Sequence, residues 1–224
     1  IGGSAFNGCS GLKSITLPKG VTSIEGYAFN GCSGLTSITI PDSVTSIEEG
    51  AFYGCSGLTS IAISDGVTSI GGYAFADCSS LTSITIPDSV TSIGFYDGYL
   101  WVNAFPGCSS LTSIKVSKGN KRYDSRDNCN AIIDTKYNGL ISGCKKTVIP
   151  KGVTWIRDSA FSGCSGLKSI TFPKGVTSIG DGAFNGCSGL KSITLPKGVT
   201  SIGDSAFANC SGLTNITLPD GVKS

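Results

Sequence analysis

The chain has 224 residues, of which 39% are hydrophobic and 14% are charged, and its formal net charge is +2. This composition supplies enough apolar material for a folded core and excludes a highly charged, disordered chain. The chain contains no histidine, which excludes Ser-His-Asp and Cys-His catalysis and removes the commonest transition-metal ligand. No apolar run in the sequence approaches the length of a membrane-spanning helix.

A repeat of 23 residues organises most of the chain. Cysteines recur at this spacing in two runs: Cys9, Cys32, Cys55 and Cys78, then Cys164, Cys187 and Cys210. The interval from Cys78 to Cys108 is longer than the repeat by seven residues, and the interval from Cys108 to Cys164 is longer by 33. A period of this length predicts a solenoid in which each unit forms one coil and covers the apolar side of its neighbour.

The order of elements within a coil follows from the unit over residues 31–55. The alternation from Leu35 to Ile40 predicts a short strand, which Pro41 ends because proline cannot donate to a ladder. Residues 44–47 predict a second short extended piece, and the glycine-containing stretch before Phe52 predicts a brief helical or 3₁₀ turn. We therefore expect an α/β leucine-rich-repeat solenoid, horseshoe-like and strand-rich, with short 3₁₀ or helical turns and parallel stacked coils of 23 residues.

The unit Ala-Phe-x-Gly-Cys-Ser-Gly-Leu-x-Ser-Ile-Thr-Leu-Pro-x-Gly-Val-Thr-Ser-Ile resembles the BspA-type leucine-rich repeats of bacterial cell-surface proteins, and the match is Bacteroidetes-like. The section over residues 128–150 is similar to the irregular hairpin cassette that interrupts such arrays, so we place a cassette at about 117–147. The resemblance implies a surface-exposed or secreted adhesive protein, and it carries over neither a catalytic motif nor a cofactor. We expect one solenoid domain over residues 1–224, truncated at both ends, because the chain starts and stops within a unit.

The first candidate binding site is the seven-residue insert over 95–101. Its candidate ligand-binding residues are Phe95, Tyr96, Asp97, Tyr99 and Trp101. A loop extruded from a repeat cannot share the packing of the columns, so these rings either fold back as a local plug or stand exposed as an anchor for a partner.

The second candidate is Trp155 with Arg157. Trp155 replaces the serine that fills its place in the other coils, and Arg157 follows two residues later. The nearby tract over 118–126 is basic and loop-like, so it either contacts an acidic protein or remains solvated.

Eight of the ten cysteines occupy the same inward position of successive coils, where we expect free thiols that satisfy backbone groups of the turns. A one-per-coil ladder does not form a tetrahedral zinc site, so we expect no metal. Cys129 and Cys144 flank a predicted hairpin, where both a disulfide and an unbridged pair remain open.

Outward strand positions carry columns of serine and threonine, without a base that could activate them. Residues 32–107 carry a charge of −7 and residues 108–224 carry +8, a difference that would steer a charged partner. The aspartate column lacks the dense oxygen ligands of known calcium loops, and the lysines, one per coil without interleaved aromatics, do not fit nucleic acid.

Two functional hypotheses follow. The first is a non-catalytic protein- or glycan-binding module of a cell-surface or secreted bacterial protein, which adheres to a macromolecule of the host or of a neighbouring cell. The alternative is a structural spacer rod that presents another domain, because near-identical coils offer little basis for distinguishing partners. An enzyme is not expected, because no catalytic group accompanies the hydroxyls.

Overall fold

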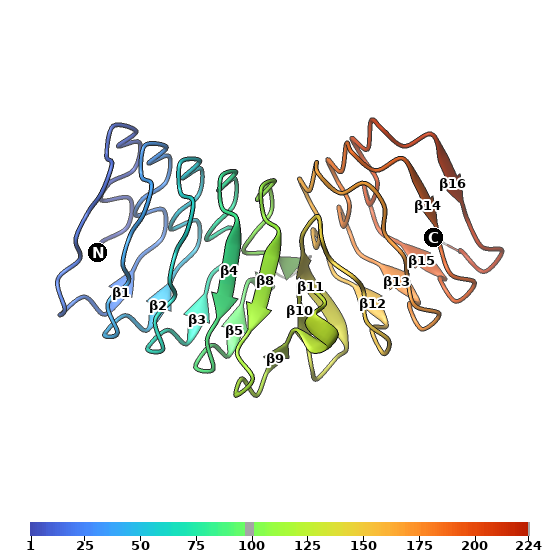
Figure 1. Ribbon diagram of the computed structural model, residues 1–224, viewed down its shortest axis with the longest axis horizontal. Coiled ribbons are helices and arrows are strands. Elements are labelled where there is room, and N and C mark those ends of the chain that lie inside the picture. The colour runs from blue at the N-terminus through green and yellow to red at the C-terminus, as the bar shows by residue number, and fades with distance from the viewer. Residues whose placement is uncertain (97–100, 224) are drawn as a thin grey trace.

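The computed structural model describes residues 1–96 and 101–223, and it stacks the repeat units as one row of coils (Figure 1). The Val-Thr-Ser-Ile pieces form the most regular sheets, in which equivalent residues of successive coils pair in parallel, as Ser23 does with Ser46. One sheet has the order β1-β2-β3-β5, with β1 (Ser23–Ile24), β2 (Ser46–Ile47), β3 (Ser69–Ile70) and β5 (Ser92–Ile93). On the far side of the cassette the same pieces are β12 (Trp155–Ile156), β13 (Ser178–Ile179) and β15 (Ser201–Ile202).

The other predicted strand of each coil is regular in only part of the array. It forms two parallel pairs, β4 (Ser83–Ile86) with β8 (Ser113–Val116) and β14 (Ser192–Thr194) with β16 (Asn215–Thr217). In the first coils it makes only isolated bridges, such as Thr16 to Thr39. The bond from the Thr59 N–H to the Thr36 carbonyl is 3.2 Å long on this side, whereas Thr45 donates to Thr22 at 2.8 Å in the main sheet.

The corners of the coils are hydrogen-bonded turns. The Val44 N–H donates to the Pro41 carbonyl at 3.0 Å, which closes the corner that the prolines predict. The expected helical or 3₁₀ segment before each Phe is instead a series of turns. Among the described residues, the 3₁₀ helix is η1 (Arg126–Asn128), which lies in the cassette. The stacked parallel strands confirm the predicted leucine-rich-repeat solenoid, with almost no helix, while its horseshoe curvature stays a prediction.

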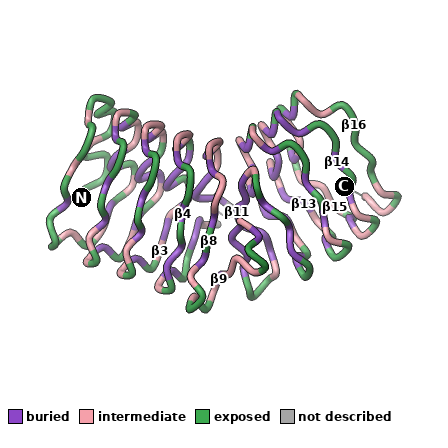
Figure 2. Tube along the Cα trace, viewed as in Figure 1, coloured by how far each residue is buried: buried purple, intermediate pink, exposed green. Residues whose placement is uncertain are grey.

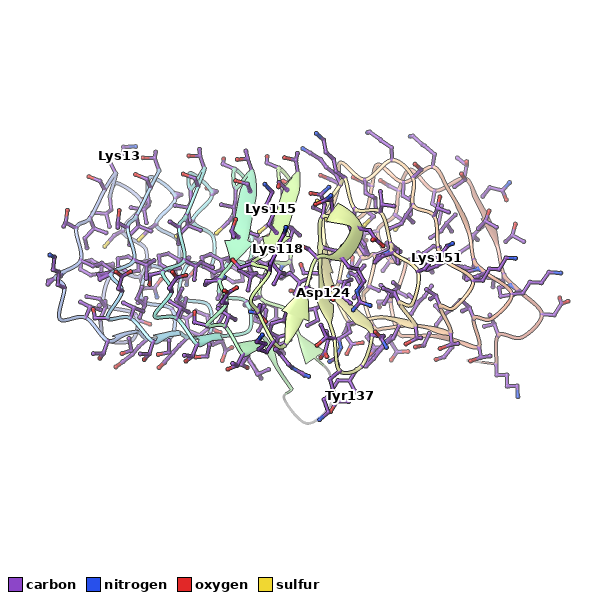
Figure 3. All side chains as sticks on the ribbon, turned by 60° about the horizontal axis from the view of Figure 1, so that its bottom comes forward. Lys13, Lys115, Lys118, Asp124, Tyr137 and Lys151 are labelled. Atoms are coloured by element: carbon purple, nitrogen blue, oxygen red, sulfur yellow. The ribbon has the colours of Figure 1, made fainter. Side chains whose placement is uncertain are left out.

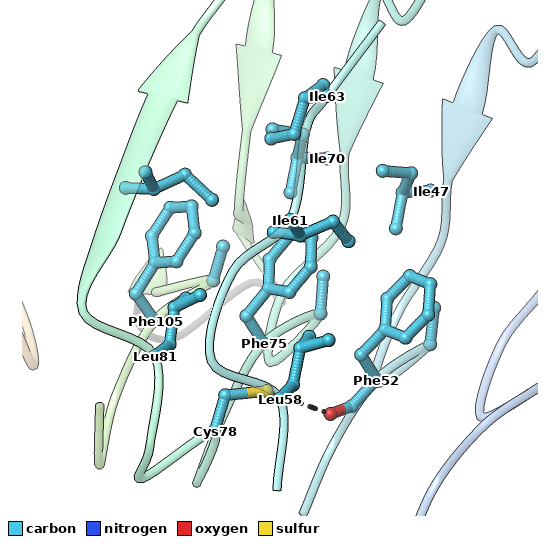
Figure 4. Packing of buried hydrophobic residues seen from close by; sticks show 14 of the residues in the cluster. Ile47, Phe52, Leu58, Ile61, Ile63, Ile70, Phe75, Cys78, Leu81 and Phe105 are labelled. Carbon is cyan, nitrogen blue, oxygen red and sulfur yellow. Dashed lines mark hydrogen bonds between the residues drawn. The ribbon is translucent and has the colours of Figure 1, made fainter. Parts of the chain in front are cut away.

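Phenylalanine rings stack along the inside of the coils. The rings of Phe52 and Phe75 lie 5.4 Å apart at 4° to each other, and Phe105 continues the stack at 5.5 Å (Figure 4). A second stack joins Phe161 and Phe184 at 4.9 Å. Each ring is covered by the equivalent ring of the next coil, which is why a single coil could not bury it.

The cysteine column lies beside these rings, and all ten cysteines are free. The Cys78 thiol donates to the Phe52 carbonyl at 3.2 Å (Figure 4), and Cys55 donates to Phe29 at 3.1 Å in the same way. The prediction that the thiols satisfy turn backbone groups is therefore confirmed. Cys9 is an exception to the predicted burial: it is exposed, because no coil covers that side of it.

The cassette interrupts the row with β9 (Tyr123–Asp124), η1, β10 (Ala131–Asp134) and β11 (Gly139–Gly143). These strands complete a sheet of order β15-β13-β12-β11-β10-β9, in which β10 is antiparallel to both of its neighbours. The hairpin has two buried faces. Ile132 packs into the core of the preceding coils, and its neighbour Ile133 packs into the core of the following coils.

Buried residues continue along the inside of the coils on both sides of the cassette (Figure 2). Cys129 lies in the core of the following coils and Cys144 in the core of the preceding coils, and both thiols are unbridged. Of the two alternatives that the sequence left open for Cys129 and Cys144, the structure shows the unbridged pair. Within the described part of the chain, no helix has the length and apolar character that a membrane crossing requires.

Candidate functional site

The insert over 95–101 begins and ends as a small antiparallel ladder. Strand β6 (Phe95–Tyr96) pairs with β7 (Trp101–Val102), with Phe95 opposite Val102. The Phe95 side chain is half-buried and lies over Gly72, where an added Cβ would meet its ring at 2.6 Å. Of the two arrangements expected for the insert rings, Phe95 therefore adopts the one that is folded back onto the coils. Asp97 and Tyr99 lie outside the described residues, as do the side chains of Tyr96 and Trp101, so an anchor role for them stays a prediction.

Trp155 and Arg157 lie together at β12. Trp155 is half-buried, and its backbone pairs with Gly139 of the hairpin on one side and with Ser178 on the other. The Arg157 guanidinium carbon lies 4.6 Å from the centre of the Trp155 ring, a cation–π contact. The two sequence-predicted residues are therefore brought together, at positions where the other coils carry serine in place of Trp155 and glycine or glutamate in place of Arg157.

The hairpin turn adds an exposed aromatic residue to this pair. Tyr137 is 51% exposed and projects at the rim of the molecule in Figure 3. Cations surround its ring: Lys136 Nζ lies 5.0 Å from the ring centre, the Arg122 guanidinium carbon 5.4 Å and that of Arg157 5.8 Å. A turn residue thus gathers side chains that lie far apart in the sequence.

The buried residue Asp134 fixes the positions of the two arginines and of the turn that carries Tyr137. Its carboxylate is buried, with 1% of the side chain exposed, and Oδ2 lies 2.8 Å from Arg122 Nη2 and 3.7 Å from Arg157 Nη2. The other oxygen accepts the backbone N–H groups of Lys136 at 2.9 Å and of Tyr137 at 3.1 Å, which fixes the turn. One buried carboxylate therefore orients both guanidinium groups and the loop that carries the tyrosine.

We call this set the cassette cluster: Arg122, Asp134, Lys136, Tyr137, Trp155 and Arg157. Burial lowers the pKa of the Arg157 guanidinium from its ordinary value, and the Asp134 and Asp158 carboxylates oppose that shift. The cluster carries three cations against one carboxylate. It can bind a polar or anionic group beside an aromatic ring, and its one carboxylate is already engaged by two guanidinium groups and two backbone N–H groups.

Four of these residues were not among the sequence candidates. Arg122 belongs to the basic tract that the sequence singles out, and Tyr137 lies in the predicted hairpin that Cys129 and Cys144 flank. No pattern pointed to the pairing of Asp134 with both arginines, because it joins the end of β10 to a residue just before β9 and a residue just after β12. Elsewhere in the tract Tyr123 is buried, and its hydroxyl accepts the N–H of Ile93 at 3.0 Å.

Over the described ranges 1–96 and 101–223, no three His, Cys, Asp or Glu residues gather in a way that could hold a metal ion. The eight thiols of the cysteine column lie one per coil, and the two cassette thiols, Cys129 and Cys144, lie in different cores. The described part of the chain is thus a scaffold of stacked coils that presents a surface cluster.

Parallel stacked coils around a phenylalanine ladder define the class of leucine-rich-repeat solenoids. The family model described as "BspA type Leucine rich repeat region (6 copies)" matches residues 1–132 and 130–224. The chain therefore belongs to the BspA-type leucine-rich-repeat family. No curated protein matches the chain.

Solved structures show the same fold. A leucine-rich cell surface protein of Faecalibacterium prausnitzii is 32% identical, with a TM-score of 0.72 over 99% of this chain and 71% of that one. A leucine-rich repeat protein of Eubacterium ventriosum is 26% identical, with a TM-score of 0.62 over 95% and 74%. One from Bacteroides ovatus is 26% identical, with a TM-score of 0.58 over 100% and 77%.

Proposed function

We propose that this chain is a non-catalytic binding module of a cell-surface or secreted bacterial protein, and that it adheres to a protein or glycan of the host or of a neighbouring cell. The likeness to a leucine-rich cell surface protein of Faecalibacterium prausnitzii supports the location. The family supports a binding role over catalysis, as does the lack of any histidine that could activate the hydroxyls and thiols of the chain.

The cassette cluster is the observation that carries this proposal. It lies where the repeat is broken, so its side chains are not dictated by the need of coils to match one another. Tyr137 is exposed and Trp155 is half-buried, and both belong to the residue types that dominate binding energies at interfaces. The buried Asp134 holds the neighbouring arginine in place, so the cluster is ordered before a partner arrives.

The test is direct binding of the purified chain to a panel of extracellular matrix proteins, plasma proteins and glycans. Trp155→Ser combined with Tyr137→Ser should weaken specific binding by at least about tenfold, because two aromatic contacts are removed. Serine already fills the Trp155 position in the following coils, at Ser178 and Ser201, so the coil should keep its fold.

Two further variants make the outcome specific. Lys168→Thr is the matched control, because it changes an exposed lysine to the residue that Thr36 places in the same column. A variant with Phe95, Tyr96, Tyr99 and Trp101 changed to Ser tests the insert as the anchor. Binding that all variants retain would contradict the cluster as the site, and no binding by the unaltered chain would favour the spacer rod. A hydrolytic activity that stays with the purified chain would contradict both functions.

A further inference from the structure

A second surface runs along the edge of the coils where the Ala-Phe-x-Gly-Cys turns stack. We call it the turn edge, and it comprises residues 25–32, 48–55, 71–78, 102–108, 157–164, 180–187 and 203–210. The edge continues past the cassette without a gap. Gly107 donates to the Ser162 carbonyl at 2.9 Å, and Gly163 donates to the Asn185 carbonyl at 2.7 Å.

The turn edge carries charge of one sign. It contains seven acidic residues and one basic residue, Arg157, which is buried beside Asp134 in the cassette cluster. The acidic residues are Glu25, Glu48, Glu49, Asp77, Asp158, Asp181 and Asp204. The lysines lie in other columns of the coil, beside the corners and strands. A concentration of one sign along an edge attracts ligands of the opposite sign.

Three tyrosines stand among these carboxylates. Tyr27, Tyr53 and Tyr73 are each 36–37% exposed, and the rings of Tyr53 and Tyr73 meet edge to face at 6.5 Å. The Tyr27 hydroxyl donates to Glu49 Oε1 at 2.8 Å, and this bond raises the pKa of Tyr27. The negative charge of Asp77 likewise raises the pKa of Tyr53. The tyrosine rings therefore lie in a negative field.

Tyr53, Tyr73 and Asp77 surround a hollow of about 290 Å³, whose opposite wall includes Pro106 and Asn185. Tyr73 and Asp77 have φ angles of 56° and 55°, in the left-handed region that a bulky residue adopts at a cost. Tyr27 occupies the position of Tyr73 in an earlier coil, and Gly50 and Ser159 fill it elsewhere, whereas most coils place glycine in the column of Asp77, as Gly54 does. The hollow thus departs from the repeat at two positions: Asp77 replaces the glycine of most coils, and Tyr53 stands where Asn30 and Asn185 stand in theirs.

We propose that the turn edge binds a basic polypeptide segment, with a lysine or arginine side chain in the hollow between Tyr53 and Tyr73 and its charge against Asp77. A cation over an aromatic face gains a cation–π contact, and the carboxylate supplies the opposite charge. The field of the remaining acidic residues steers the rest of the segment. This site is independent of the cassette cluster, whose excess charge has the opposite sign.

The test uses the 224-residue chain and a fluorescein-labelled peptide of alternating arginine and serine residues, with binding followed by fluorescence anisotropy. Asp77→Gly should weaken binding by about tenfold, and Tyr53→Asn with Tyr73→Ser by a similar factor. Each substitution restores a residue that other coils carry in the same column, such as Gly54, Asn30 and Ser159. Circular dichroism confirms that the variants keep the fold.

Asp65→Ser is the matched control, because it removes the same charge from an exposed corner of the coil and should change the affinity by less than about twofold. A peptide of alternating glutamate and serine should not bind. The proposal is overturned if Asp65→Ser weakens binding as much as Asp77→Gly does, since that would show unspecific attraction. It is also overturned if the basic peptide does not bind while a neutral oligosaccharide does. Neither result bears on the cassette cluster, which the panel tests separately.

Discussion

At the scale of single residues, the cysteine column shows how a repeated side chain serves the stack. Six of the nine buried thiols reach back to the carbonyl of a phenylalanine in the preceding coil, as Cys187 does to Phe161 at 3.2 Å. The thiol is small enough for the interior and donates a second, weak hydrogen bond to a carbonyl that also accepts a backbone N–H, as Phe161 does from Cys164 at 3.0 Å. The column is therefore a structural ladder rather than a set of reactive groups.

This interpretation predicts a large difference in reactivity among the ten thiols. Burial raises the pKa of Cys55 to about 12 and that of Cys129 to about 11, so neither is a thiolate near neutral pH. A disulfide reagent at about pH 8 should label Cys9 rapidly and the nine buried thiols only after unfolding in guanidinium. Counting labelled residues by mass spectrometry checks this, and Cys9→Ser should abolish the rapid phase. Rapid labelling of several thiols in the folded chain would contradict it.

At the scale of elements, the hairpin of β10 and β11 depends on Asp134. The carboxylate is buried at the end of β10, where it joins the turn to Arg122 of the cassette and to Arg157 after β12. Asn103 makes a second connection, because its side chain donates to the carbonyls of Ile141 at 3.2 Å and of Ser159 at 3.0 Å. Polar groups thus bind the irregular hairpin to the regular coils.

Asp134→Ala should lower the free energy of unfolding by about 3–5 kcal/mol, because it leaves the partly buried guanidinium groups without their carboxylate. Asp134→Asn should cost less, since its amide oxygen still accepts the N–H groups of the turn. Urea unfolding measures both. The matched control is Asp124→Ala, which breaks the more exposed pair with Arg126 and should cost about 1 kcal/mol or less. Equal losses for Asp124→Ala and Asp134→Ala would contradict the role given to Asp134.

At the scale of the whole molecule, the cassette divides one row of coils into two hydrophobic cores. Ile132 and Ile141 face the preceding coils, whereas Ile133 and Leu140 face the following coils. In a solenoid each unit is stabilised mainly by its immediate neighbours. The hairpin therefore acts as the last neighbour of one array and the first neighbour of the other.

Substitutions on the two faces of the hairpin should destabilise different halves of the chain. Ile132→Ala should accelerate amide hydrogen exchange mainly in residues 81–116, and Ile133→Ala mainly in residues 149–179, each with a loss of about 2–5 kcal/mol. Exchange followed by mass spectrometry separates the two patterns, and each variant is the control for the other. The same pattern in both variants would show that the two cores unfold as one unit.

The sequence by itself determined the coil, its corner and its inward columns, because the repeat places the same residues at the same step of every coil. The motif also identified the family. The tertiary structure alone decided which residues outside the repeat contact one another. Asp134 contacts Arg122 and Arg157 because the hairpin lies between two arrays of coils, and the 23-residue period does not predict that contact.

The same distinction applies to charge. The sequence showed an acidic stretch followed by a basic one along the chain. The stack also places charges of different sign at different positions around each coil. Carboxylates from both halves of the chain lie on the turn edge, whereas the lysines lie in other columns. Neighbours on that edge are about one period apart in the chain, and at the cassette more than two periods apart. Their common surface arises only because successive turns hydrogen-bond to one another across the break.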